Sequence, residues 1–238
     1  MKQIITLLFL VVILGLNAQT FEGKLVYSMD FEVSEKMAGM GLTKEMLKSK
    51  MAEDDSWSDT IKITYKQGYY RQESSSVFET KIIYRPDSNM LYTFQAGEAS
   101  DICTVTDVSK DLEFKMIGKM PSVMLLDSIV EYNDYKLKVV EVKWKSGRYY
   151  YLFDENHFKA NPEDYKGHVY DGFYEYLKLS KSYPIVIVKE AGAVMTVTMS
   201  LEYFTEEKVN PEVFEIPALV EDEELFNSPM GKMMRIKD

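Results

Sequence analysis

Residues 21–33 read FEGKLVYSMDFEV, and apolar side chains alternate with polar ones along this stretch. A period of two is typical of a β-strand that buries one face and exposes the other. Residues 194–204, VMTVTMSLEYF, show the same alternation. Both stretches therefore predict long strands of a sheet whose apolar face must be covered by another layer. The apolar positions are Phe21, Leu25, Tyr27, Met29, Phe31 and Val33, then Met195, Val197, Met199, Leu201 and Tyr203.

Shorter apolar runs between these two stretches predict further strands, separated by turn residues such as those at 67–68, 86–89 and 146–147. Strands at intervals of roughly 8–12 residues indicate an antiparallel sheet that bends around itself. We expect a single domain over residues 19–217, followed by a loosely held tail, acidic and then Met-rich, at 218–238. The predicted strands are 61–66, 69–74, 77–85, 89–95, 102–108, 135–144, 148–154 and 183–190.

Two methionine-bearing segments interrupt the strand pattern and are candidate covers of the sheet. Residues 34–51 place apolar side chains every three to five residues, which predicts a short amphipathic helix capped by Thr43. Residues 107–126 predict a second helical or irregular segment. The chain has 15 methionines, and flexible thioether side chains suit a surface that repacks around variable apolar ligands. The alternative is that methionine simply fills an irregular core.

The first 18 residues are typical of a secretory signal peptide. Lys2 supplies the positive charge, residues 4–16 form a short apolar run, and Ala18 precedes the expected cleavage point. An ordinary membrane-spanning helix needs about 20 apolar residues, so an uncleaved anchor is the weaker alternative. We expect an exported protein, periplasmic or secreted, with no transmembrane segment after cleavage.

Charge and cysteine content exclude several function classes. The net charge of −10 argues against nucleic acid and anionic membrane surfaces as partners, since both attract basic patches. The single cysteine, Cys103, cannot form an internal disulfide. We expect it to be a small buried hydrophobe; a reactive thiol is the alternative, although no His or Lys neighbours it in sequence.

Both histidines of the chain, His157 and His168, lie in residues 148–168, RYYYLFDENHFKANPEDYKGH. With Asp154 and Glu155 they would be acceptable zinc ligands. Their spacing does not fit a helical pair of ligands at i and i+4, and no other histidine or nearby cysteine joins them. We therefore expect ordinary loop histidines, no metal and no catalytic base.

The acids of the same stretch have a structural explanation. Asn161 and Pro162 predict a helix start, with the acids at 163–164 in its first turn. If this connection matters for function, we expect it to act as a cover over the sheet, with Phe158 and Tyr165 as the relevant side chains.

Enzymatic chemistry finds little support in the sequence. A G-x-S-x-G elbow is absent, and none of the carboxylates stands in a distinctive context. The tyrosines at 149–151 could stack on sugars, but alternation along a strand splits them between the two faces of the sheet. We predict no catalytic residue, no cofactor and no enzyme activity.

Five motifs along the chain carry a resemblance to a known group. In order they are FEGKLVYSMDFE (21–32), YKLKVVEVKWKSGRYYYLFDENHF (135–158), SYPIVIVKEAG (182–192), VMTVTMSLEYF (194–204) and VNPEVFEIP (209–217). This order resembles uncharacterised secreted proteins of Gram-negative bacteria that are grouped with LolA-like periplasmic lipoprotein carriers. In that group an Asx-Pro-x-x-Phe-x-Ile-Pro stretch follows the last strand, matched here by Asn210, Pro211, Phe214, Ile216 and Pro217. The segment at 34–60 is longer than the corresponding segment of that group.

The resemblance implies a mainly β (α+β) fold: a strongly curved antiparallel sheet forming an unclosed half-barrel, with short helices over its concave face. In the carriers this concavity holds acyl chains, whereas the uncharacterised relatives have no established ligand, so function transfers weakly.

The leading hypothesis is an exported, non-enzymatic protein that binds a hydrophobic ligand, either a lipid or the acyl chain of a lipoprotein, in this concavity. The alternative is an envelope interaction or stress-related protein with a filled core and no small ligand. The predicted ligand contacts are Tyr27, Met29, Phe31, Met46, Met124, Met195, Val197, Met199 and Leu201.

Overall fold

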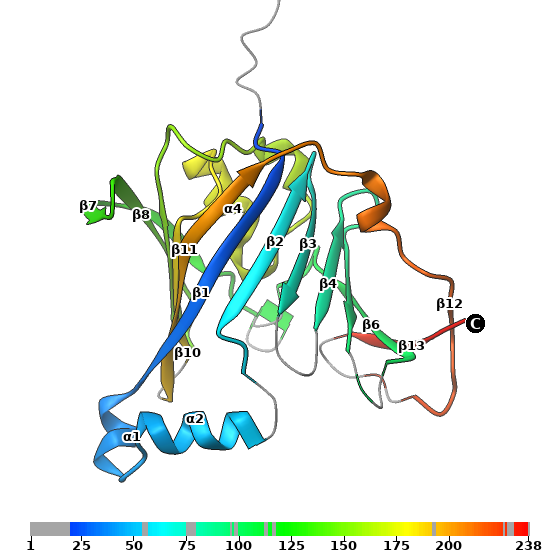
Figure 1. Cartoon of the computed structure of the whole chain (residues 1–238), viewed down its shortest axis with the longest axis horizontal. Helices are drawn as coiled ribbons and strands as arrows, with labels where there is room; N and C mark the ends of the chain where they lie inside the picture. The colour runs from blue at the N-terminus through cyan, green and yellow to red at the C-terminus, as the bar shows by residue number, and fades with distance from the viewer. Residues whose placement is uncertain are drawn as a thin grey trace, which may run out of the picture.

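The computed structural model describes residues 20–53, 57–74, 80–95, 97, 100–111, 114–115, 118–191, 194–225, 227 and 231–237. The expected signal peptide therefore lies outside the described residues. Within them, 13 strands form one antiparallel sheet (Figure 1). The strands are β1 (Gly23–Val33), β2 (Thr60–Lys66), β3 (Tyr69–Ser74), β4 (Lys81–Arg85), β5 (Met90–Phe94), β6 (Ile102–Asp107), β7 (Ser122–Tyr132), β8 (Tyr135–Lys143), β9 (Arg148–Phe153), β10 (Val186–Ala191), β11 (Met195–Glu206), β12 (Leu219–Val220) and β13 (Lys232–Ile236).

The sheet curves but does not close. Its strand order is β12-β13-β6-β5-β4-β3-β2-β1-β11-β10-β9-β8-β7, so β12 and β7 are its two edges and are not hydrogen-bonded to each other. The predicted unclosed half-barrel is confirmed. Most neighbours in the sheet are also neighbours in sequence, which is why turn positions and alternation were sufficient to predict it.

The two alternating stretches of the sequence pair with each other at the middle of the sheet. In β1 and β11, Tyr27 lies opposite Leu201, Met29 opposite Met199 and Phe31 opposite Val197. These six side chains therefore share one face. A register shift between Val26 and Tyr27 leaves an extra residue in β11, and such bulges increase local twist.

The connection between β9 and β10 covers the concave face. It contains the 3-10 helices η2 (Pro162–Tyr165) and η3 (Tyr170–Gly172) and the helix α4 (Phe173–Ser180), and α4 lies behind β1 and β2 in Figure 1. Asn161 caps η2 by accepting a hydrogen bond from the Glu163 amide, and Pro162 stands in the first turn, as predicted. Phe158 is 5% exposed and Tyr165 fully buried, as expected of covering side chains.

The methionines that the structure describes in these two segments do not cover the sheet, and that prediction is wrong for them. Residues 34–51 form α1 (Glu35–Gly39) and most of α2 (Lys44–Glu53), which lie beyond the end of β1 (Figure 1). Met46 is 57% exposed there. Charged residues surround the few apolar side chains of α2, so it has no continuous apolar face to bury. Met124 is also exposed, because it belongs to the edge strand β7 and not to a helix.

A second, smaller core lies on the opposite, convex face. Phe214, from the 3-10 helix η4 (Pro211–Phe214), packs there with Ile83, Phe94 and Cys103. Burial raises the pKa of the Cys103 thiol to about 12, which supports the buried hydrophobe over the reactive thiol. The chain then returns to the sheet, where β13 pairs with β6 and β12 with β13. The expected loose tail is therefore wrong for these residues, which form the edge of the sheet.

Candidate functional site

A cavity of about 370 Å³ lies on the concave face, between the sheet and the connection that covers it. Mostly apolar and aromatic side chains from the sheet form one wall, which also includes Gln72 and Lys189. The covering connection supplies His168, Tyr170 and Asp171 opposite. The lining comprises Ile63, Tyr65, Tyr70, Gln72, Ile82, Leu91, Tyr149, Tyr151, His168, Tyr170, Asp171, Phe173, Pro184, Ile187, Lys189 and Met199.

An ion pair stands in this cavity. Lys189 Nζ, from β10, lies 3.1 Å from a carboxylate oxygen of Asp171 and 4.7 Å from the centre of the Tyr149 ring. Burial opposes the charge on Lys189, but the Asp171 carboxylate and Tyr149 outweigh it, and the pKa of Lys189 lies above its ordinary value. The cavity therefore contains one ammonium group and one carboxylate, both fixed in position beside aromatic rings.

Backbone geometry sets the position of Asp171. It has a φ of 57° and the following Gly172 a φ of 64°, both in the left-handed region. The Tyr151 hydroxyl donates a 3.1 Å hydrogen bond to the Asp171 carbonyl. Strained backbone of this kind persists where the surrounding structure fixes it, and it gathers at functional sites.

Replacing Gly172 with Ala should destabilise the protein by about 1.5 kcal/mol, because an L side chain is strained at this φ. The added Cβ would also lie 2.6 Å from Val142 Cγ1. Chemical denaturation measures the loss. The matched control is Gly41→Ala, which has a φ of 86° but open space around the added Cβ. An equal loss in both variants would show that contact with Val142 is unimportant.

His168 lies in the loop between η2 and η3, but it is buried and lines this cavity, so the expectation of an ordinary loop histidine is wrong. The residue is 3% exposed, and its Nε2 shares a 2.9 Å hydrogen bond with the Tyr70 hydroxyl. Its Nδ1 is buried and has no hydrogen-bond partner among the described residues. Burial lowers the pKa of His168 to about 4. His157 does fit the expectation: its side chain is half exposed, and Nδ1 lies 3.3 Å from Asp154.

The predicted ligand-contact residues separate into four groups in the structure. Met199 lines the cavity. Tyr27, Phe31 and Leu201 are buried on the same sheet face, and the Tyr27 hydroxyl donates to the Pro184 carbonyl over 2.7 Å. Met29, Met195 and Val197 are half-buried at the far end of the same two strands. Met46 and Met124 lie on the surface and contribute nothing to the cavity, so sequence reasoning placed them wrongly.

Sequence reasoning missed the polar residues of the cavity. Asp171, Lys189 and Tyr70 stand on three different elements, and no spacing in the sequence links them. One weak indication was present: Lys189 is the only charged residue on the inward side of an otherwise apolar strand, since it shares its face with Ile187.

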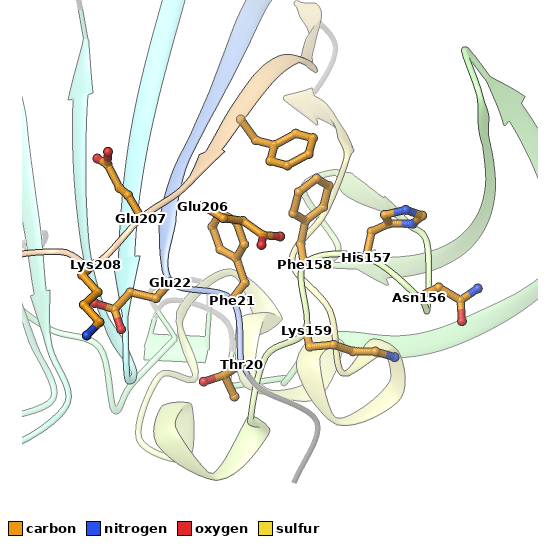
Figure 2. A pocket seen from close by; sticks show the side chains of 11 residues that line it. Thr20, Phe21, Glu22, Asn156, His157, Phe158, Lys159, Glu206, Glu207 and Lys208 are labelled. Atoms are coloured by element: carbon orange, nitrogen blue, oxygen red, sulfur yellow. The ribbon is translucent and has the colours of Figure 1, made fainter. Parts of the chain in front are cut away.

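A second cavity, of about 450 Å³, lies where β1 begins and β11 ends (Figure 2). Phe21 and Phe158 pack edge to face there with ring centres 5.4 Å apart, and Phe204 lies 4.9 Å from Phe158. The Glu22 carboxylate accepts hydrogen bonds from Lys66 Nζ and from the Val209 amide. The aromatic contacts cover this end of the hydrophobic core. The other charged side chains that line the cavity lie at the surface of the protein.

Two further features are absent from the described part of the chain. It contains no group of three or more His, Cys, Asp or Glu side chains arranged to hold a metal ion. None of its helices is long and apolar enough to cross a membrane. The chain matches no protein-family model and no curated protein.

Proposed function

We propose that this protein is an exported, non-enzymatic carrier that binds an amphipathic molecule, a lipid or the acyl chain of a lipoprotein, in the cavity of its concave face. The observation that carries the proposal is an aromatic and aliphatic cavity with one half-buried ion pair at its wall. Ligand sites in proteins have this character: mostly apolar, with a few placed polar groups, and about 300–1,000 Å³ in volume.

The cavity has an aliphatic part and a charged part, and these give the expected orientation of the ligand. The aliphatic side chains of Ile63, Ile82 and Leu91 would contact the hydrocarbon part. The Lys189 ammonium would meet the polar headgroup, together with Nδ1 of His168, which has no hydrogen-bond partner among the described residues. Because Asp171 already neutralises Lys189, we expect a headgroup that accepts hydrogen bonds, such as an ester, amide or hydroxyl, or one carboxylate.

Blocking the cavity should abolish binding of an acyl-chain probe. Gln72 lines the cavity from β3 and is half-buried. Gln72→Trp would fill part of the volume, and we expect at least a tenfold loss of affinity for a fluorescent fatty acid, about 1.4 kcal/mol. Fluorescence titration measures this, and native mass spectrometry of the purified protein shows whether a lipid copurifies.

Thr198→Trp is the matched control. Thr198 precedes Met199 in β11 and points to the other face of the sheet, so the same indole ring is added outside the cavity. We expect the control variant to keep the affinity of the unaltered protein. The carrier proposal fails if the unaltered protein binds no probe and carries no lipid, or if both variants bind as well as it does.

The alternative, an envelope interaction or stress-related protein with no small ligand, is favoured by a different observation. The edge strand β7 exposes Met124, Leu125 and Ile129, with Ile129 at 65%. Exposed apolar edge strands are places where another chain can add to a sheet. A chain that binds no acyl probe would leave this alternative as the better supported of the two.

A further inference from the structure

We propose that the convex face carries an anion-binding site, formed by Lys62, Arg71 and Lys81, for a phosphate group attached to an apolar or aromatic moiety. The site is a cavity of about 500 Å³ on the side of the sheet opposite the concave cavity. It is independent of the carrier proposal, because it shares no residue with that cavity.

The strand register places the charges of the site in one row across the sheet. From β11 to β5, one residue of each strand lies directly opposite one residue of the next. The first two of these residues carry the side chains of Tyr203 and Val26, the next three are charged, and the last is aromatic. Because directly opposed residues of antiparallel strands point to the same face, all six lie on the convex side. In order the row is Tyr203, Val26, Lys62, Glu73, Lys81 and Phe94.

The ion pairs within this row leave a surplus of positive charge. Glu73 is the only carboxylate among the residues that line the cavity, and it contacts both Lys62 Nζ at 2.8 Å and an Arg71 nitrogen at 2.5 Å. Lys81 has no ion-pair partner among the described residues and lies over the Phe94 ring, 4.4 Å from its centre. Three cations and one carboxylate give the lining a net charge of +2, in a chain whose net charge is −10.

Arg71 and Lys81 are also incompletely satisfied. Arg71 Nε is buried and has no hydrogen-bond partner among the described residues. Burial, and then the charge of Arg71, lower the pKa of Lys81. A bound anion would relieve the repulsion between these two cations. The free energy of anion binding should therefore be more favourable here than at separate surface lysines.

The remaining lining selects the class of anion. The hydroxyls of Thr60 and Ser74 and the amide of Gln95 add neutral hydrogen-bond groups around the cations. The +2 charge matches a phosphate monoester, which carries nearly two negative charges at neutral pH. Tyr203, 59% exposed, lies at one end of the row beside the buried Val26, and its ring offers an apolar surface for the group that carries the phosphate.

Isothermal titration of the purified protein tests the site, with inorganic phosphate and phenyl phosphate as probes. Phenyl phosphate should bind more tightly, since its ring can lie on Tyr203, and Tyr203→Ala should remove that difference. Lys62→Gln and Lys81→Gln should each weaken binding at least fivefold, by about 1 kcal/mol. Lys36→Gln, an exposed lysine of α1, is the control and should leave the affinity unchanged.

Glu73→Gln gives the opposite result and separates a binding role from a structural one. Removing the carboxylate raises the charge of the lining from +2 to +3, so phosphate should bind more tightly even if the variant is less stable. The proposal is overturned if ~10 mM phenyl phosphate gives no signal, a concentration that saturates sites with dissociation constants near ~1 mM. It is also overturned if the Lys62, Lys81 and Glu73 variants all bind as the unaltered protein does.

A second arm distinguishes the sources of the phosphate. The same variants are sedimented with phosphatidylglycerol vesicles and with phosphatidylcholine vesicles. Binding of phenyl phosphate without vesicle binding assigns the site to a soluble phosphate ester. Binding to phosphatidylglycerol vesicles that Lys81→Gln abolishes assigns it to a lipid headgroup, and binding that Lys81→Gln leaves intact contradicts the proposal.

Discussion

Tyr176→Ala should lower the free energy of unfolding by about 4 kcal/mol, as expected when a fully buried aromatic ring is removed. Tyr176 is fully buried at the inner side of α4 and stacks on Tyr151 with ring centres 4.5 Å apart. Its hydroxyl donates a 2.7 Å hydrogen bond to the Ser182 carbonyl. The substitution therefore leaves a cavity beneath the helix and a buried carbonyl that loses this donor. Urea denaturation followed by circular dichroism measures the loss.

Two further variants separate the contributions of the ring and the helix. Tyr176→Phe keeps the ring and removes only the hydrogen bond, and it should cost about 1 kcal/mol. Leu179→Ala alters the same helix at a side chain that is 44% exposed, and it should cost less than about 1 kcal/mol. If Leu179→Ala were as damaging as Tyr176→Ala, α4 would not be anchored through its inner face as the structure indicates.

Acidification from pH 7 to pH 5 should destabilise the protein by about 2 kcal/mol through His168 alone. Burial lowers the pKa of this imidazole from 6.5 to about 4 in the folded protein. Between those two values the unfolded chain binds a proton that the folded protein excludes, so stability falls as the pH falls. The stabilisation is complete above the unfolded pKa and is lost progressively down to about pH 4. Denaturation at several pH values measures it.

The choice of pH range separates His168 from the carboxylates. Glu22 and Asp30 have lowered pKa values, first because of hydrogen bonds from Lys66 and Lys44, and their ordinary values are 4.5 and 3.8. The stability that they supply is lost only below about pH 4.5, so these carboxylates do not contribute to the change in stability between pH 5 and 7.

The second histidine is the matched control. His157 is half exposed, and His157→Gln is the variant with which His168→Gln is compared. His168→Gln should flatten the pH dependence of stability between pH 5 and 7, although the variant is less stable at pH 7 because the Tyr70 hydroxyl loses its partner. A His168 variant that kept the full slope would show that another group is responsible.

Local patterns were enough to predict the curved sheet. Alternation in 21–33 and 194–204 identified β1 and β11, and turn residues placed most of the strands between them, because antiparallel neighbours joined by short turns need only local information. The cap formed by Asn161 and Pro162 was predictable for the same reason, since a capping hydrogen bond spans only a few residues.

Local patterns predict the cover of the sheet only in part, because they indicate Phe158 and Tyr165 but favour the two methionine-bearing segments. The methionines of 34–51 and 116–125 looked suitable, yet Met46 and Met124 are exposed, and the cover is the connection that carries Tyr165 and Tyr176. Tyrosine gives a weak burial pattern because its hydroxyl is polar. Only the folded chain supplies the partners, such as Tyr183 for Tyr165, that allow it to be fully buried.

The sequence by itself determined most of the strands, their turns and the apolar face that they share, because each depends on residues close together in the chain, whereas β7, β12 and β13 were not predicted. The tertiary structure alone decided the candidate sites. Lys189, Asp171 and His168 meet because β10 pairs beneath the covering connection, and Lys62, Glu73 and Lys81 form a row because three strands hold one register. Both arrangements are long-range, and a side chain's charge and pKa depend on the neighbours it acquires only when the sheet is complete.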